Sequence, residues 1–164
     1  MTAYLFRPAE EQDAETIHTL YRSLAGTPFC AWDDSYPGRE QIADDLAAHA
    51  LYCLCDSSDL IAAAAIRHWE EHDAYAFWSP EMKRPCDLLR LGVSRSLQGR
   101  GIGRCFLTCL RNEARRKGFD GMRILVAETN LPARALYRKI GAEVRGNAVS
   151  YGIRWECLEW IWKT

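Results

Sequence analysis

The chain has 164 residues, of which 48% are hydrophobic and 26% are charged, and its formal net charge is −1. This length suits a single domain over residues 1–164 with a core that needs no disulfides. The sequence shows neither a bilayer-length apolar run nor a signal peptide, and its pI of 6.4 argues against a nucleic-acid binder. We therefore expect no membrane or nucleic-acid partner.

The seven cysteines have no C-x-x-C spacing, so a zinc ribbon is not predicted. Cys53 and Cys55 would share one face of a strand, and Cys105 and Cys109 one face of a helix. The simplest interpretation is a set of reduced thiols in a cytoplasmic protein without a metal site.

The charges are unevenly distributed along the chain. Residues 1–82 carry a net charge of −11, residues 83–123 carry +8, and residues 124–164 carry +2. A basic central segment suits a polyanionic ligand and an acidic first half suits a cationic one, whereas both could also be faces that pair with each other.

The first half of the chain alternates between helical and strand patterns. Asp13 is a candidate N-cap and Gly26 a stop for the first helix. The segment 70–86 has no clear pattern and is long for a hairpin loop, which is typical of functional loops. The elements predicted here are a strand at 4–7, a helix within 13–26, a loop at 27–38, a helix at 39–50 and strands at 51–56 and 60–69.

In the second half, glycine and proline residues mark the ends and starts of the predicted helices. Gly118 and Gly141 follow predicted helices, and Pro132 lies in the first turn of one. The predicted elements are a strand at 87–93, helices at 101–117 and 131–140, and strands at 121–129, 142–146 and 153–163. The order βααβββαβαββ predicts a mixed α/β layer fold.

The stretch "LQGRGIGR" (97–104) places three glycines between a predicted strand and a predicted helix. The first N–H groups of a helix have no internal partner and carry partial positive charge. Glycine lets a ligand approach them without meeting a Cβ. With Arg100 and Arg104 beside these groups, the turn is predicted to bind a phosphate or diphosphate.

Neither of two common nucleotide motifs fits this turn, because G-x-x-x-x-G-K-[ST] is absent and G-x-G-x-G differs from the Rossmann spacing. "QGRGIG" instead fits Q/R-x-x-G-x-G/A, the acyl-CoA diphosphate motif of the GNAT family of N-acetyltransferases. "ILVAETNLPARALYRKIGAEV" resembles the fifth strand and fourth helix of that family, and "YLFRPAEEQDAE" its opening strand and first helix. The sequence thus resembles the GNAT family over nearly its whole length.

The resemblance implies an α/β (α+β) fold with a mixed, mostly antiparallel sheet of six to seven strands. About four helices would flank the sheet, and strands four and five would splay apart. It also implies acetyl-CoA as cosubstrate and no metal. Family members are often dimers, so a homodimer is an expectation from the resemblance.

By the same resemblance, the glycine turn would hold the CoA diphosphate, and the end of strand four would bind the pantetheine through its main chain. A main-chain N–H near Leu91 or Val93 would polarise the thioester carbonyl. Plain core packing is the alternative for these two residues, and helix capping is an additional role for Asn130. The expected cofactor-binding residues are Leu91, Gly92, Val93, Gln98, Gly99, Arg100, Gly101, Ile102, Gly103, Arg104 and Asn130.

Attack of an amine on a thioester needs a base for the ammonium and an acid for the departing sulfur. Tyr137 stands where the family places a tyrosine aimed at the CoA sulfur, so the resemblance assigns it the acid role. Asp87, six residues before Val93, stands where many members have a carboxylate base, and as the shorter acid it would need a water relay. Nearby alternatives for the base are Glu70, Glu71, His72 and Asp73.

The acidic first half contains aromatic residues beside its carboxylates, which is a pattern that suits a cationic amine. The predicted function is transfer of an acetyl group to a small cationic amine in a ternary complex. A protein lysine or N-terminal amine acetyltransferase, with an open acceptor groove, is one alternative. A non-catalytic acyl-CoA-binding module is another.

Overall fold

The structure is a computed structural model that describes residues 3–162, so Lys163, the expected end of the last strand, lies outside the described residues. The strands are β1 (Leu5–Pro8), β2 (Leu51–Asp56), β3 (Asp59–Arg67), β4 (Pro85–Val93), β5 (Gly121–Ala127), β6 (Glu143–Ser150) and β7 (Ile153–Ile161). The helices are α1 (Ala14–Leu24), α2 (Arg39–Ala47), α3 (Ile102–Arg116) and α4 (Leu131–Lys139), with short 3₁₀ turns at Glu11–Asp13, Glu70–Ala74 and Arg95–Leu97.

The seven strands form one mostly antiparallel sheet in the order β1-β2-β3-β4-β5-β7-β6. The exception is the parallel pair β4 and β5. Their pairing covers only Pro85–Leu88 against Gly121–Ile124, and beyond it the two strands diverge. The predicted element order and the predicted splay between the fourth and fifth strands are confirmed.

A β-bulge in β4 lies just past the end of this parallel pairing. Leu89 pairs with Ala65 and Gly92 with Ala63, so that Arg90 and Leu91 together oppose one residue of β3. Arg90 has a φ of 54°. A bulge bends its strand and increases the local twist, which helps to turn the end of β4 away from β5.

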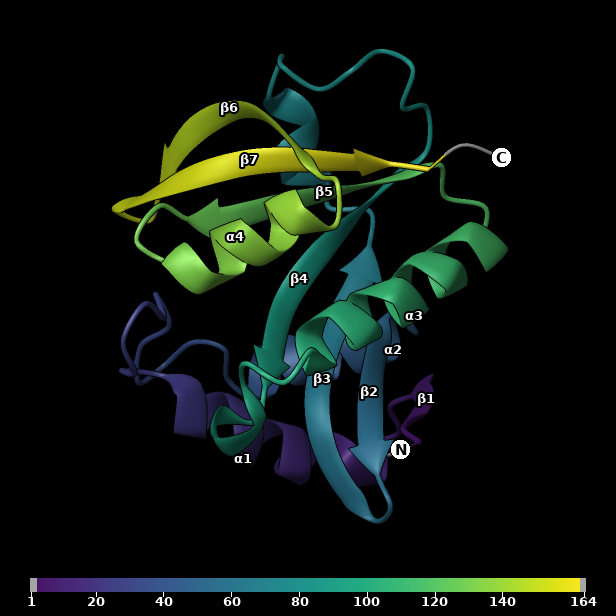
Figure 1. The fold of residues 1–164 in the computed structure, drawn as a ribbon, viewed down its shortest axis with the longest axis vertical. Coiled ribbons are helices and arrows are strands. Elements are labelled where there is room, and N and C mark those ends of the chain that lie inside the picture. The colour runs from purple at the N-terminus through teal and green to yellow at the C-terminus, as the bar shows by residue number, and fades with distance from the viewer. Residues whose placement is uncertain (1–2, 163–164) are drawn as a thin grey trace.

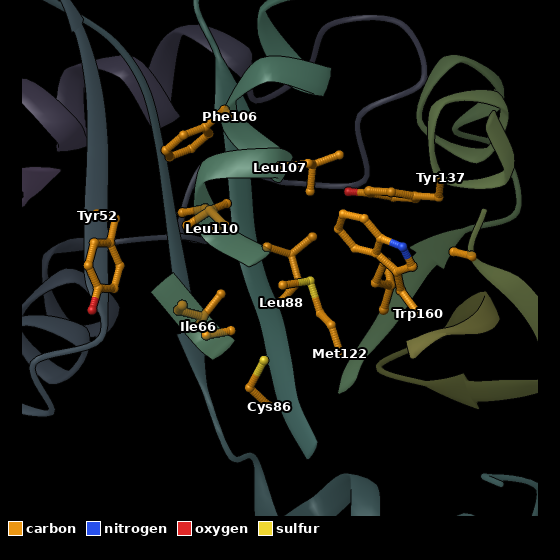
Figure 2. Packing of buried hydrophobic residues seen from close by; sticks show 14 of the residues in the cluster. Tyr52, Ile66, Cys86, Leu88, Phe106, Leu107, Leu110, Met122, Tyr137 and Trp160 are labelled. Atoms are coloured by element: carbon orange, nitrogen blue, oxygen red, sulfur yellow. The ribbon is translucent and has the colours of Figure 1, made fainter. Parts of the chain in front are cut away.

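The sheet has a hydrophobic cluster on each face. One lies under α3 and α4 and contains Phe106, Leu107 and Trp160 (Figure 2). The other lies under α1 and α2 and contains Ile17 and Ile42. Figure 1 shows α3 and α4 on the near side of the strands and α1 and α2 behind them.

Candidate active site where β4 and β5 diverge

A cavity of about 430 Å³ opens between β4 and β5 where their pairing ends. The end of β4, the glycine turn, the start of α4 and the loop between α1 and α2 all contribute to its lining. It brings together most of the residues expected from the sequence, namely Leu91, Gly92, Val93, Gln98, Gly99, Gly101, Gly103, Arg104, Asn130 and Tyr137. Three expected residues, Asp87, Arg100 and Ile102, are outside the lining.

The glycine turn presents bare main chain to this cavity. Gly99 and Gly101 both have a φ of 80°, and a Cβ on either would meet no described atom within 4 Å. Gly101 is the N-cap of α3, whose first intrahelical bond is donated by the N–H of Cys105. The N–H groups before it therefore point out of the helix towards the turn. The turn therefore has the open main chain and the free N–H groups that an anion site requires.

Gly103 and Ile102 have packing roles in the same turn. A Cβ on Gly103 would lie 3.1 Å from Leu136 Cδ2, so glycine lets α3 and α4 approach closely. Ile102 is buried in the core. The two residues fix the position of the turn relative to α4, which carries Tyr137.

The end of β4 has a main-chain edge that β5 does not cover, since the β4–β5 pairing ends at Leu88. Leu91 and Val93 pack on the cluster under α3 and α4, while Gly92 faces α1. The Gln98 side-chain amide donates to the Val93 carbonyl at 3.1 Å, which ties the turn to the strand.

Two of the expected site residues belong to the α4 region and line the cavity. Asn130 is the N-cap of α4, and its Oδ1 accepts from the N–H of Ala133 at 3.3 Å. Tyr137 is 6% exposed; it belongs to the core cluster (Figure 2) and also lines the cavity. Burial raises the pKa of Tyr137 above its ordinary value of about 10, so the phenol keeps its proton at neutral pH.

Asp87 is fully buried, and both its oxygens are occupied. Arg123 donates to them through Nε (2.9 Å) and Nη2 (2.7 Å), and the Trp69 N–H donates at 2.7 Å. The fourth partner is Nδ1 of His72, 2.7 Å from Oδ1. A carboxylate with four donors has little capacity left to take a proton from an amine.

Asp87 is part of a row of alternating charges across four strands. Arg67, Asp87, Arg123 and Glu159 pair side by side in register from β3 to β7. Opposite charges on neighbouring strands stabilise a sheet face. The row crosses the sheet at the paired segment of β4 and β5, directly before the strands diverge.

The sequence left residues 70–86 unassigned; in the structure β3 ends at Arg67 and β4 begins at Pro85, and the segment 68–84 between them binds to this row of charges. Arg123 also donates to Asp73 and to the Trp69 carbonyl, and Glu159 accepts from the N–H and hydroxyl of Ser79. Phe77 packs against Gly146, where no side chain would fit. The segment thus covers the face of β5, β6 and β7 that lies opposite α4 (Figure 1).

The contact between Nδ1 of His72 and the Asp87 carboxylate orients the His72 ring. Because the Asp87 carboxylate only accepts hydrogen bonds, the proton of a neutral His72 ring sits on Nδ1 and the lone pair on Nε2. The ring stacks on Tyr75, with centroids 5.9 Å apart, and its side chain is 14% exposed. The sequence contained both residues, but no local pattern joins His72 to Asp87.

The far side of the cavity is a surface that we call the acceptor wall. Leu125 and Trp155 belong to it, and they lie on the face of β5 and β7 opposite the core residue Ile124. From the sequence, the aromatic residues expected near the acceptor are Trp32, Tyr36, Trp69, Tyr75 and Trp78, and of these five, all among the described residues, Trp32 alone lines the cavity. The acceptor wall consists of Phe29, Cys30, Trp32, Arg90, Leu125 and Trp155.

Two of the carboxylates that suggested a cationic acceptor, Asp45 and Asp33, bind other groups of the chain. Asp45 is buried and pairs with Arg90 and Arg67. Asp33 accepts from the N–H groups of Ser35 and Tyr36. The charge asymmetry of the sequence is therefore partly explained by pairing between the two halves.

Two absences concern the described residues 3–162. No group of three His, Cys, Asp or Glu side chains within them could hold a metal ion, and no helix within them is long and apolar enough to cross a membrane. All seven cysteines fall in this range and are free thiols.

The splayed mixed sheet and the glycine turn beside the splay agree with the fold expected from the resemblance. The model of the acetyltransferase (GNAT) family matches residues 17–142, so this chain belongs to the GNAT family. No curated protein sequence matches the chain.

Solved structures show the same fold. A GNAT-family acetyltransferase from Streptococcus agalactiae is 22% identical with a TM-score of 0.80, covering 98% of this chain and 96% of its own. The yncA protein of Salmonella typhimurium, solved with its cofactor acetyl-CoA, is 19% identical with a TM-score of 0.74, covering 97% and 94%. The ribosomal-protein-S18-alanine N-acetyltransferase of Escherichia coli is 16% identical with a TM-score of 0.73, also covering 97% and 94%.

Proposed function

We propose that this protein transfers an acetyl group from acetyl-CoA to a primary amine of a small molecule. The observation that carries the proposal is the bare main chain of Gly99 and Gly101 at a cavity that also contains the Tyr137 phenol. Acetyl-CoA would supply an acetyl group activated as a thioester. The chain itself must bind it, remove a proton from the amine and protonate the leaving sulfur.

The residues around the turn fit a diphosphate. Gly99 and Gly101 leave room for the ligand, and the N-terminus of α3 supplies N–H donors and a favourable dipole. Arg100 and Arg104 add charge at the same end. The free edge of β4 at Leu91–Val93 suits an extended chain of amide groups, which would bind as an additional strand.

Tyr137 is proposed as the acid. The raised pKa keeps this buried phenol protonated at neutral pH, so it can donate a hydrogen bond that stabilises the departing thiolate. Its position on α4 beside the cavity supports this role, and Asn130 would contact the cofactor arm at the start of the same helix.

His72 is proposed as the base, with Asp87 as the positioning residue that orients it. The Asp87 carboxylate is engaged by four donors, which favours a role through its imidazole partner. Asp87 fixes the tautomer that leaves the Nε2 lone pair of His72 available, as in other carboxylate-oriented imidazole bases. His72, like Asp87, is outside the lining of the cavity, so the proposal keeps a water relay between Nε2 and the amine.

The base assignment is tested with His72→Gln and a matched control, His68→Gln, on the same segment. We expect His72→Gln to lower kcat by about a hundredfold with the KM for acetyl-CoA unchanged. Exogenous imidazole should restore part of the activity of His72→Gly, and His68→Gln should behave as the parent. Parental kcat in His72→Gln would exclude His72 as the base.

The function itself is tested by thiol release from acetyl-CoA with a panel of small amines and lysine peptides. Release with a small amine, and none with peptides, is the expected result. Release with peptides alone would favour the protein acetyltransferase. Acetyl-CoA binding in calorimetry without thiol release from any acceptor would favour a non-catalytic binding module.

A further inference from the structure

The chemistry of the acceptor wall indicates which amine the cavity accepts. This inference rests on the proposed transferase function and concerns the same cavity. Phe29, Trp32 and Trp155 contribute aromatic rings to the wall, and Leu125 an aliphatic side chain. Among the described residues that line the whole cavity, the charged ones are Arg90 and Arg104, and no carboxylate is included.

Arg90 is the one charged residue of the acceptor wall, and its polar groups are occupied. Its Nε and Nη2 donate to the two oxygens of Asp45 at 2.9 and 2.6 Å, and its Nη1 donates to the Tyr36 hydroxyl at 3.0 Å. The Arg90 side chain is 5% exposed. The bidentate pair with Asp45 offsets much of the charge of Arg90, and each of its nitrogens already donates within the chain, so Arg90 is a weak partner for a substrate carboxylate.

The other polar side chains of the wall carry no charge. The indole N–H of Trp155 donates to Ser150, which leaves the apolar surface of the ring for a ligand. Burial raises the pKa of the Cys30 thiol, so it carries no charge at neutral pH. Trp32 packs edge-on against Tyr21, with ring centroids 5.2 Å apart.

A substrate with a second positive charge would meet no anion on this wall. Moving an ammonium from water onto an apolar surface without a counter-charge is strongly unfavourable. The nearest buried carboxylate, Asp45, already holds Arg90 and Arg67. A polyamine is therefore disfavoured, whereas an aromatic group would bury its surface against the rings of Phe29 and Trp155.

We propose that the acceptor is a primary amine carried on an aromatic or apolar group with no second charge, of the arylalkylamine class. The amine would face the thioester, and its aromatic group would lie against the acceptor wall. This differs from the cationic acceptor that the charge distribution of the sequence suggests.

The test compares kcat/KM for three probes of similar reach, which are 2-phenylethylamine, spermidine and L-phenylalanine. The first has one amine and a ring, the second has extra ammonium groups, and the third adds a carboxylate. We expect 2-phenylethylamine to exceed each of the others by at least about tenfold. A preference for spermidine or phenylalanine would overturn the acceptor class while leaving the proposed function intact. Release with lysine peptides alone would overturn both the acceptor class and the small-molecule function.

Two variants connect the preference to the wall. Phe29 is 49% exposed, so Phe29→Ala should fold, and we expect it to lower kcat/KM for 2-phenylethylamine about tenfold without changing the KM for acetyl-CoA. Tyr151, an aromatic residue that is 87% exposed and outside the cavity lining, provides the matched control Tyr151→Ala. Equal effects of the two variants would contradict the wall assignment. Absence of thiol release with every probe and peptide would instead overturn the proposed function.

Discussion

Replacement of Asp87 by asparagine should destabilise the protein strongly. The change preserves the shape of the side chain but removes its negative charge, and Asp87 is 0% exposed. Arg123, whose side chain is 3% exposed, would keep one acidic partner, Asp73, which is 47% exposed and screened by water. Removing one member of a buried ion pair costs about 3–5 kcal/mol, and Asp73 should hold the cost near about 3 kcal/mol.

For a chain of this length, about 3 kcal/mol corresponds to a fall in Tm of roughly 6–12 °C. Urea titration should show the same loss in the free energy of unfolding, with an unchanged m-value. Asp73→Asn is the matched control, because it removes the exposed partner of the same guanidinium and should cost less than about 1 kcal/mol. Equal stability of Asp87→Asn and the parent would refute the buried pair.

The same variant also tests the positioning role. At a temperature where Asp87→Asn is folded, we expect kcat to fall by at least about tenfold while the KM for acetyl-CoA stays at the parental value, because asparagine no longer fixes the tautomer of His72. Loss of stability with parental kcat would mean that Asp87 serves the fold alone.

Three further variants test the site. Gly101→Asp should abolish acetyl-CoA binding in calorimetry because a carboxylate would project into the open anion turn, whereas Gly141→Asp, at another glycine with positive φ, controls for backbone strain. Tyr137→Phe should lower kcat about a hundredfold. Because burial raises the pKa of this phenol, the parental kcat should show no descending limb due to its ionisation below about pH 10, and such a limb lost in Tyr137→Phe would contradict the raised pKa. Gly92→Ala should cost about 1–3 kcal/mol in urea titration because its Cβ would lie 2.8 Å from Leu24 Cδ1, and parental stability would show that Leu24 can move aside.

The parts of the site that the sequence predicts are those written in consecutive residues. The glycine turn, the capping Asn130 and the glycine after α4 are local signals, because each acts on backbone within a few positions of itself. Those signals were enough to order the elements correctly. Most of the cofactor-binding residues expected from the sequence line one cavity in the structure.

The parts that escaped prediction depend on residues far apart in the chain. The pairing of Asp87 with Arg123 spans 36 positions and needs the register of two parallel strands, while that of Asp45 with Arg90 spans 45. From composition alone, Asp45 would be free to bind a ligand. The fold shows that its carboxylate pairs with Arg90. The segment 68–84 has no hydrophobic periodicity in the sequence because its position is fixed by hydrogen bonds to Arg123 and Glu159, which lie far along the chain.

The brief contact between β4 and β5 divides the sheet into two lobes. Strands β1–β4 form one lobe and β5–β7–β6 the other, and within the sheet they are joined by four pairs of residues between β4 and β5. A ligand bound along the unpaired edge of β4 would contact both groups of strands and restrict their relative motion. Ligand binding should therefore slow amide hydrogen exchange in both groups of strands, including residues that do not contact the ligand.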